Sequence, residues 1–153
     1  MQRNQAPTLE PLRLAAAIVV HYDRILLVQR SGKEGFLPRR WGIPCGKLDG
    51  DEEPRRGVLR ELREETGLAG TVIKYAGHQT FRSDWMGREV ENLQDNFLVS
   101  PSGVDEIEFP DIDPPETDQG WEWVPIDMIE TFGLDLHNLT AIRQGLRARS
   151  VKW

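Results

Sequence analysis

Residues 54–66 have the sequence Pro-Arg-Arg-Gly-Val-Leu-Arg-Glu-Leu-Arg-Glu-Glu-Thr and form the one strong helical pattern of this chain. Pro54 favours a helix start, and Gly67 followed by Leu68 is typical of a helix end with glycine in the left-handed conformation. A helix over this range would make about three and a half turns. Its apolar stripe is formed by Val58, Leu59 and Leu62.

Three glutamates, Glu61, Glu64 and Glu65, fall within one arc of about 100° beside that stripe. Carboxylates at this spacing repel one another, by a few tenths of a kcal/mol per pair, and the helix dipole opposes them at the C-terminal end. One interpretation is an ordinary exposed helix with Glu–Arg pairs, since Arg56, Arg60 and Arg63 are expected on the far side and Arg60 can pair with Glu64. Because hard divalent cations such as Mg²⁺ prefer oxygen ligands, the trio beside the apolar face favours a metal site.

The sequence around this helix predicts strands on both sides of it. Alternation at period two and apolar runs between turn residues mark the strands, and Gly and Pro make residues 41–47 irregular. Leu139, Ile142 and Leu146 predict an amphipathic helix near the C-terminus. This order indicates one mixed α/β domain over 1–153 with a largely antiparallel sheet and 1–11 as a loose lead-in. The predicted strands are 12–20, 24–30, 71–81, 89–99 and 121–124.

Composition narrows the class of protein. The chain has 153 residues, 39% hydrophobic and 29% charged, as expected of a soluble globular domain. It has neither an apolar run of the ~20 residues that span a bilayer nor a signal peptide at residues 1–10, so we expect no membrane association. The single cysteine, Cys45, excludes a disulfide framework and suggests a cytoplasmic location. Twenty-five acidic residues against 19 basic ones give a net charge of −6, which argues against a broad nucleic-acid surface.

A longer motif contains the glutamate helix. Gly46, five residues, Glu52, seven residues and then Arg-Glu-Leu-Arg-Glu-Glu-Thr-Gly-Leu at 60–68 resemble the Nudix box, and every defined position of that pattern matches. Many members of the family carry a second glycine where this chain has Cys45.

The resemblance implies a Nudix-type α/β/α sandwich with a mixed, largely antiparallel sheet. It also implies hydrolysis of a diphosphate bond in a nucleoside diphosphate derivative, dependent on Mg²⁺ or Mn²⁺. A homodimer is a further possibility, because dimers are common in the family. Arg60 would orient the glutamates, and Glu52 would brace the loop. The implied metal ligands are Glu61, Glu64, Glu65 and the Gly46 carbonyl.

Diphosphate chemistry gives these residues a physical role. The negative oxygens shield phosphorus from a nucleophile until positive charge neutralises them, and a divalent ion supplies that charge and aligns a water. A nearby carboxylate then takes the proton, and both Glu61 and Glu64 are placed to do so. A further ligand or base is expected from the acidic segment 100–120, where Glu116 is the candidate and Asp113 and Asp118 are rivals.

Substrate contacts are predicted outside the box. Arg30, Arg39 and Lys47 belong to a local basic cluster that would hold outer phosphates, unless these charges are simply solvated. Trp85, at the predicted hairpin tip, would stack on a nucleobase; filling the core or a dimer contact is the alternative.

Two other functions were considered. A nucleotide-sensing module without catalysis would be expected to have lost box glutamates, and this chain retains all of them. An isomerase would need a catalytic cysteine–glutamate pair, for which Cys45 is the only candidate cysteine. Among hydrolase substrates, nucleoside triphosphates, nucleotide sugars, dinucleoside polyphosphates and capped RNA all stay open.

Overall fold

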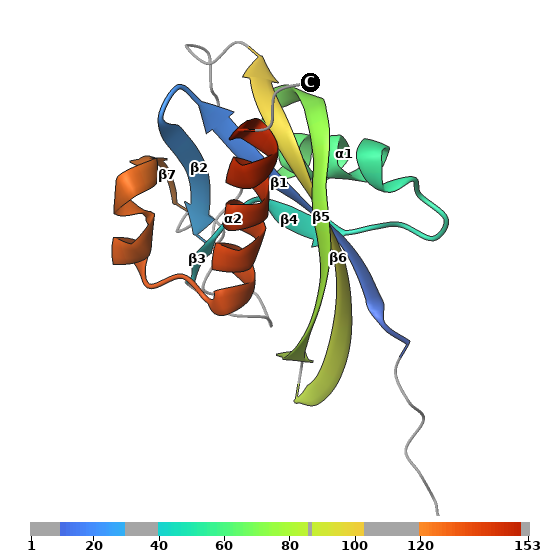
Figure 1. Cartoon of the computed structure of the whole chain (residues 1–153). Coiled ribbons are helices and arrows are strands. Elements are labelled where there is room, and N and C mark those ends of the chain that lie inside the picture. Colours follow the sequence, from blue (N-terminus) through green and yellow to red (C-terminus); the bar gives the residue numbers. More distant parts are fainter. Residues whose placement is uncertain (1–9, 30–39, 86, 103–119, 151–153) are drawn as a thin grey trace, which may run out of the picture.

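A computed structural model describes residues 10–29, 40–85, 87–102 and 120–150 (Figure 1). The predicted elements are present, and the helices are α1 (Pro54–Thr66), the 3₁₀ helix η3 (Ile126–Phe132) and α2 (Leu136–Ser150). The strands are β1 (Leu12–His21), β2 (Arg24–Gln29), β3 (Trp41–Gly42), β4 (Cys45–Lys47), β5 (Ala69–Trp85), β6 (Arg88–Ser102) and β7 (Trp121–Pro125).

The seven strands form one mixed sheet with the order β3-β2-β1-β6-β5. β4 adds to β1, and β7 adds to β2. The β1–β6 pair is parallel, from Leu12 opposite Asn92 to Val19 opposite Val99, and all other pairs are antiparallel. The predicted fold class, with its largely antiparallel sheet, is therefore confirmed.

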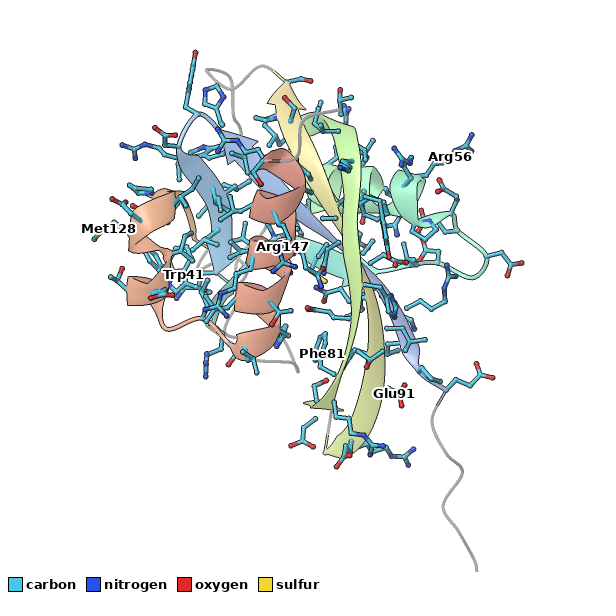
Figure 2. All side chains as sticks on the ribbon, in the orientation of Figure 1. Trp41, Arg56, Phe81, Glu91, Met128 and Arg147 are labelled. Atoms are coloured by element: carbon cyan, nitrogen blue, oxygen red, sulfur yellow. The ribbon has the colours of Figure 1, made fainter. Side chains whose placement is uncertain are left out.

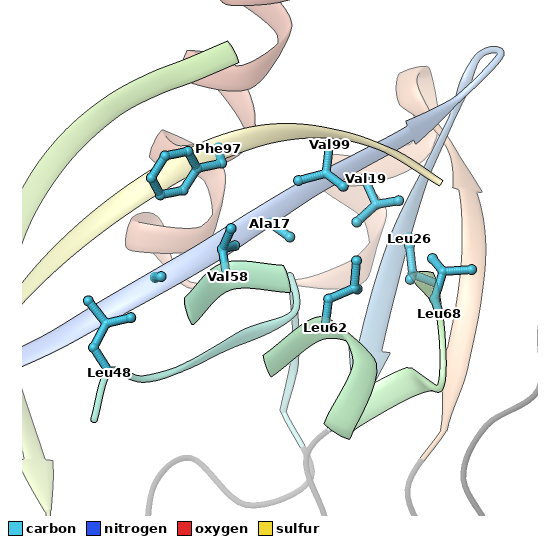
Figure 3. Packing of buried hydrophobic residues seen from close by; sticks show 10 residues of the cluster. Ala17, Val19, Leu26, Leu48, Val58, Leu62, Leu68, Phe97 and Val99 are labelled. Atoms are coloured by element: carbon cyan, nitrogen blue, oxygen red, sulfur yellow. The ribbon is translucent and has the colours of Figure 1, made fainter. Parts of the chain in front are cut away.

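Helices α1 and α2 cover opposite faces of this sheet, as an α/β/α sandwich requires (Figure 1). Period-two alternation along β1 sends Ala15, Ala17 and Val19 toward α1, where they pack with Val58 and Leu62 (Figure 3). The intervening Ala16 and Ile18 face α2 and pack in the second core cluster. Small residues on β1 let both helices approach the centre of the sheet.

Helix α1 has the predicted bounds because its ends carry strong local signals. At the N-terminus the Glu53 carboxylate accepts hydrogen bonds from the backbone N–H groups of Arg55 and Arg56. At the C-terminus Gly67 has φ 73° and donates its N–H to the Arg63 carbonyl. These caps fix where the glutamate-bearing turn begins and ends.

Three details differ from the sequence-based expectation. The hairpin arms, β5 and β6, are longer than predicted, because pairing continues to Trp85 opposite Arg88. Residues 41–47, predicted to be irregular, form the short strands β3 and β4 on either side of Pro44. The 3₁₀ helix over 126–132 was not predicted. In the described part of the chain, no helix is long and apolar enough to cross a membrane.

Candidate active site

Glu61 lies directly against the backbone of Gly46, where α1 meets β4. A Cβ atom built on Gly46 would lie 2.5 Å from Glu61 Cγ and closer still to its carboxyl group. Glycine at position 46 therefore provides the space that the Glu61 carboxylate occupies. Burial is the largest effect on this carboxyl group and raises its pKa above the usual range, against the opposing effect of Arg60.

Arg60 connects three glutamates of the site. Its Nε and Nη2 atoms each lie 2.7 Å from a carboxylate oxygen of Glu52, in a bidentate pair. Its Nη1 atom donates to Glu61 at 3.0 Å and to Glu64 at 2.9 Å. The expectation that Arg60 lies on the far side of the helix was wrong, because its long side chain curls back over the glutamates. Arg56, in contrast, is exposed and points away from the sheet (Figure 2).

Glu52 connects the loop before α1 to Arg60. The hydrogen bond from Arg60, followed by one from the Asp49 N–H, lowers the pKa of Glu52 to about 2. Asp49 itself lies 3.4 Å from Arg60 and was not predicted as part of the site. The loop is thus held on the helix by charge-assisted hydrogen bonds.

Glu65 contacts β4 rather than Arg60. Its Oε2 atom accepts a hydrogen bond from the Cys45 N–H at 3.1 Å. The bonds from Ala17 N–H to the Pro44 carbonyl and from Leu48 N–H to the Arg13 carbonyl set the β1–β4 register, in which Gly46 pairs with Ala15. Antiparallel alternation then directs the Gly46 carbonyl toward β1 and the N–H and carbonyl of Cys45 toward the outer edge, beside Glu65.

The donor chemistry of this region fits a hard divalent cation. Glu61, Glu64 and Glu65 supply carboxylate oxygens, and the absence of a side chain at Gly46 lets the Glu61 carboxylate lie against β4. Within the described residues, however, no three acidic, His or Cys side chains converge closely enough to hold an ion. Arg60 holds Glu61 and Glu64, so their carboxylates would have to turn from it to bind a metal.

A pocket adjoins Glu65 on the α2 face of the sheet. The cavity is small, about 30 Å³, and part of it is open to solvent, so a ligand larger than a water molecule would extend out of its mouth. Three aromatic rings and several polar side chains converge on it. Its lining is Val28, Arg40, Trp41, Gly42, Ile43, Cys45, Glu65, Phe81, Gln94, Asp135, His137 and Asn138.

One carboxylate of this pocket has an oxygen atom with no hydrogen-bond donor among the described residues. Asp135 Oδ1 accepts from Arg40 at 2.6 Å, whereas its Oδ2 atom is buried without a hydrogen-bond partner in the described part of the chain. Phe81 of β5 stacks on His137 at the start of α2, with ring centroids 4.2 Å apart (Figure 2). This pocket is not predictable from the sequence, because its residues come from distant segments and follow no motif.

Of the predicted site residues outside this cluster, Lys47 is the one whose side chain the structure describes. Lys47 is exposed, and its backbone carbonyl accepts a hydrogen bond from Arg60 at 3.2 Å. Arg30, Arg39 and Glu116 lie outside the described residues, as does the side chain of Trp85.

Comparisons with known proteins agree with this fold and motif. A family model described as NUDIX domain matches residues 11–144. An RNA pyrophosphohydrolase of Gluconacetobacter diazotrophicus is 36% identical over 122 residues, covering 67% of this chain and 70% of that protein. A CTP pyrophosphohydrolase of Escherichia coli is 39% identical over 69 residues, covering 44% of this chain and 50% of that protein.

Solved structures show the same architecture. A NUDIX hydrolase from Nitrosomonas europaea superposes with a TM-score of 0.71 at 18% identity, covering 94% of this chain and 97% of the other. A MutT NUDIX hydrolase from Burkholderia pseudomallei has a TM-score of 0.65 at 25% identity, covering 89% of this chain and 98% of the other.

Proposed function

Because this chain belongs to the Nudix family, we propose that it hydrolyses a diphosphate bond of a nucleoside triphosphate or related nucleotide with the help of Mg²⁺ or Mn²⁺. The observation that carries the proposal is the cluster around Arg60, in which Glu52, Glu61 and Glu64 are held together at the end of β4. Such a cluster costs free energy through carboxylate repulsion unless cations balance it. All four charged residues come from the complete family motif.

The metal would be held by Glu61, Glu64 and Glu65. It would neutralise the diphosphate oxygens and align a water for attack. The sequence prediction added the Gly46 carbonyl as a main-chain ligand. The strand register instead favours the Cys45 carbonyl, which points to the outer edge of β4 on the side of Glu65.

Glu61 and Glu64 are the candidates for the proton acceptor in the described part of the chain. Glu61 is half-buried with a raised pKa, a shift toward the range in which a base works best near neutral pH. Glu64 is 59% exposed, so its carboxylate turns easily between Arg60 and a ligand. Arg60 would orient both.

The pocket beside Glu65 is proposed to hold the nucleobase. Trp41, Phe81 and His137 offer aromatic surface for stacking, and the Asp135 Oδ2 atom lacks the donor that a buried acceptor needs. An amino or ring N–H group of a base would supply that donor. The diphosphate would then pass Glu65 toward Glu61 and Arg60.

Four further roles remain predictions from the sequence. Arg30, Arg39 and Lys47 would contact outer phosphates, and Trp85 would stack on a base or fill space. The cytoplasmic location and the homodimer also stay predictions. The named relatives are pyrophosphohydrolases of RNA and of CTP, and CTP belongs to the substrate class that we propose.

The test is a panel of nucleoside triphosphates and other diphosphate derivatives with Mg²⁺ or Mn²⁺, with products identified by mass spectrometry. Excess chelator should abolish turnover, and Glu64→Gln should lower kcat by at least ~10²-fold because it removes a charged ligand or base. Arg56→Gln, on the exposed side of α1, is the matched control and should keep normal kcat. Turnover that survives chelation, or normal kcat in Glu64→Gln, would refute the assignment.

A further inference from the structure

Three buried amide side chains lie side by side on the face of β6 that packs against α2. Asn92, Gln94 and Asn96 are each no more than 2% exposed, at positions where a buried strand ordinarily carries apolar residues. An amide transferred to such a place without hydrogen bonds destabilises the folded protein. Their bonding partners therefore need an explanation.

Gln94 and Asn96 belong to a chain of hydrogen bonds that runs in one direction. The Cys45 thiol donates to Gln94 Oε1 at 3.5 Å, and Gln94 Nε2 donates to Asn96 Oδ1 at 2.8 Å. Asn96 Nδ2 then donates to Gln144 Oε1 at 2.8 Å, and Gln144 Nε2 reaches the His78 carbonyl at 3.5 Å. The chain thus joins α2 and β5 to β4 through the interior.

Two glycines make room for this connection. A Cβ on Gly77 would lie 2.5 Å from Gln144 Oε1, and a Cβ on Gly145 would lie 2.8 Å from Ile18 Cγ2. Without side chains at these positions, α2 approaches the sheet closely enough for Gln144 to meet Asn96. At both glycines, the packing of α2 on the sheet leaves no space for a side chain.

The end of the chain at Cys45 is the end next to the candidate active site. Cys45 belongs to a three-residue strand that pairs with β1, and among the described strands none pairs with its outer edge. On that edge its N–H donates to Glu65. The side chain and the N–H of one strand residue turn together when the strand rotates, so an anchor on the thiol also fixes the direction of the N–H.

We propose that Gln94 is a positioning residue, which holds Cys45 so that the Cys45 N–H keeps the Glu65 carboxylate in the orientation used at the metal site. The inference rests on the proposed function through the role of Glu65. Partners that orient metal ligands typically change metal affinity or activity by about 10–100-fold when they are removed. Asn92 gives the contrast, because in the described part of the chain its side-chain bonds go to the β5–β6 hairpin, at the Phe81 and Val90 carbonyls and Ser83 Oγ.

The test compares Gln94→Met with Asn92→Leu, since both replace an equally buried amide on the same face of β6. In metal-free, ¹⁵N-labelled protein, we compare the exchange rate of the Cys45 amide with that of the Val99 amide, which reports global stability. The ratio of the Cys45 rate to the Val99 rate should be about 10-fold higher in Gln94→Met than in wild type. In Asn92→Leu that ratio should match wild type. Unchanged Cys45 exchange in Gln94→Met would overturn the inference, whether or not the protein is an active hydrolase.

Mn²⁺ titration followed by electron paramagnetic resonance gives the second measurement. Gln94→Met should bind Mn²⁺ about 10-fold more weakly and lower kcat without raising KM, whereas Asn92→Leu should bind as wild type does. Raised KM with normal kcat would mean that Gln94 contacts the base directly and would overturn the positioning role. Absence of Mn²⁺ binding in wild type would refute the proposed function, while the exchange experiment would still decide this inference.

Cys45→Ala serves as a second variant if Gln94→Met does not fold. It removes only the thiol at the start of the chain and should likewise accelerate exchange of its own amide. The double variant Cys45→Ala/Gln94→Met should be no worse than the stronger single one, because both break the same connection. Additive effects on Mn²⁺ affinity would contradict a shared pathway.

Discussion

Replacing Gly46 by alanine tests whether Glu61 must lie where the structure places it. The added methyl group would lie 2.5 Å from Glu61 Cγ, whereas ordinary contact begins near 3.4 Å, so the side chain must move by about 1 Å or more. Gly46 lies in β4 and its φ is not in the left-handed region, so alanine fits the backbone. A misplacement of about 1 Å in a catalytic constellation typically costs ~10²-fold, and we expect that loss in kcat.

The displacement has a signature that does not depend on activity. A Glu61 carboxylate pushed toward solvent loses the burial that raises its pKa, so its pKa should fall toward 4.5 in a ¹³C NMR titration of metal-free protein. Gly50→Ala is the control: φ is 42° there, so alanine strains the backbone by about 1–2 kcal/mol, but no atom lies within 4 Å to be displaced.

A double-mutant cycle completes the test. In a Glu61→Ala background the clash partner is absent, so Gly46→Ala should change stability by less than about 0.5 kcal/mol. Normal kcat in Gly46→Ala together with an unchanged Glu61 pKa would refute the reasoning, because the Glu61 carboxylate would then keep its burial and its activity beside the added methyl group.

Two further predictions test single contacts, and a third tests the role that the sequence predicts for Glu116. Arg60→Ala should return the pKa of Glu52 from about 2 toward 4.5 in a ¹³C titration. The lowered pKa stabilises the folded state above pH 4.5, and this stabilisation is lost as the pH falls through 2. The variant should therefore lose less stability than wild type over that pH range. A Glu52 pKa that stays near 2 in this variant would show that Arg60 is not the group that lowers it. Thr66→Val should cost about 1–3 kcal/mol in urea unfolding, because the buried hydroxyl bonds the Leu62 carbonyl and the Leu68 N–H; a loss under 0.5 kcal/mol would argue against it. Glu116→Gln should lower kcat with little change in KM, and the same change at Glu106 or Glu108 should be nearly silent; equal small effects in all three would leave Glu61 or Glu64 as the base.

Local signals were the part of the structure that could be predicted. Pro54 and Gly67 fixed the bounds of α1, and the box spacing placed Glu52, Glu61 and Glu64 in one site before any contact was visible. Arg60 shows that the angular position of a residue on a helix does not determine what its side chain contacts. Its Cα direction leads away from the glutamates, but a flexible side chain of this length reaches back to all of them.

Non-local arrangement was the part that could not be predicted. Nothing in the sequence of β6 indicates that α2 covers the face with Asn92, Gln94 and Asn96, where Gln94 bonds to Asn96 and Asn96 bonds to Gln144. The pocket has the same origin, because Phe81 and His137 meet only when α2 packs on β5. A periodic pattern states which residues share a face, but not what lies opposite.

The parallel pairing of β1 with β6 has a consequence for synthesis of the chain. Leu12 pairs with Asn92, a separation of 80 residues (92 − 12), so β1 leaves the ribosome long before its main partner. At about 5–20 residues per second, the delay is roughly 4–16 s. During it, β2, β4 and α1 can already contact β1, but the edge of β1 that β6 will occupy is open to pairing with another chain. Expression should therefore be limited by aggregation of nascent chains, and slower initiation or holdase chaperones should raise the soluble yield more than stabilising the finished fold.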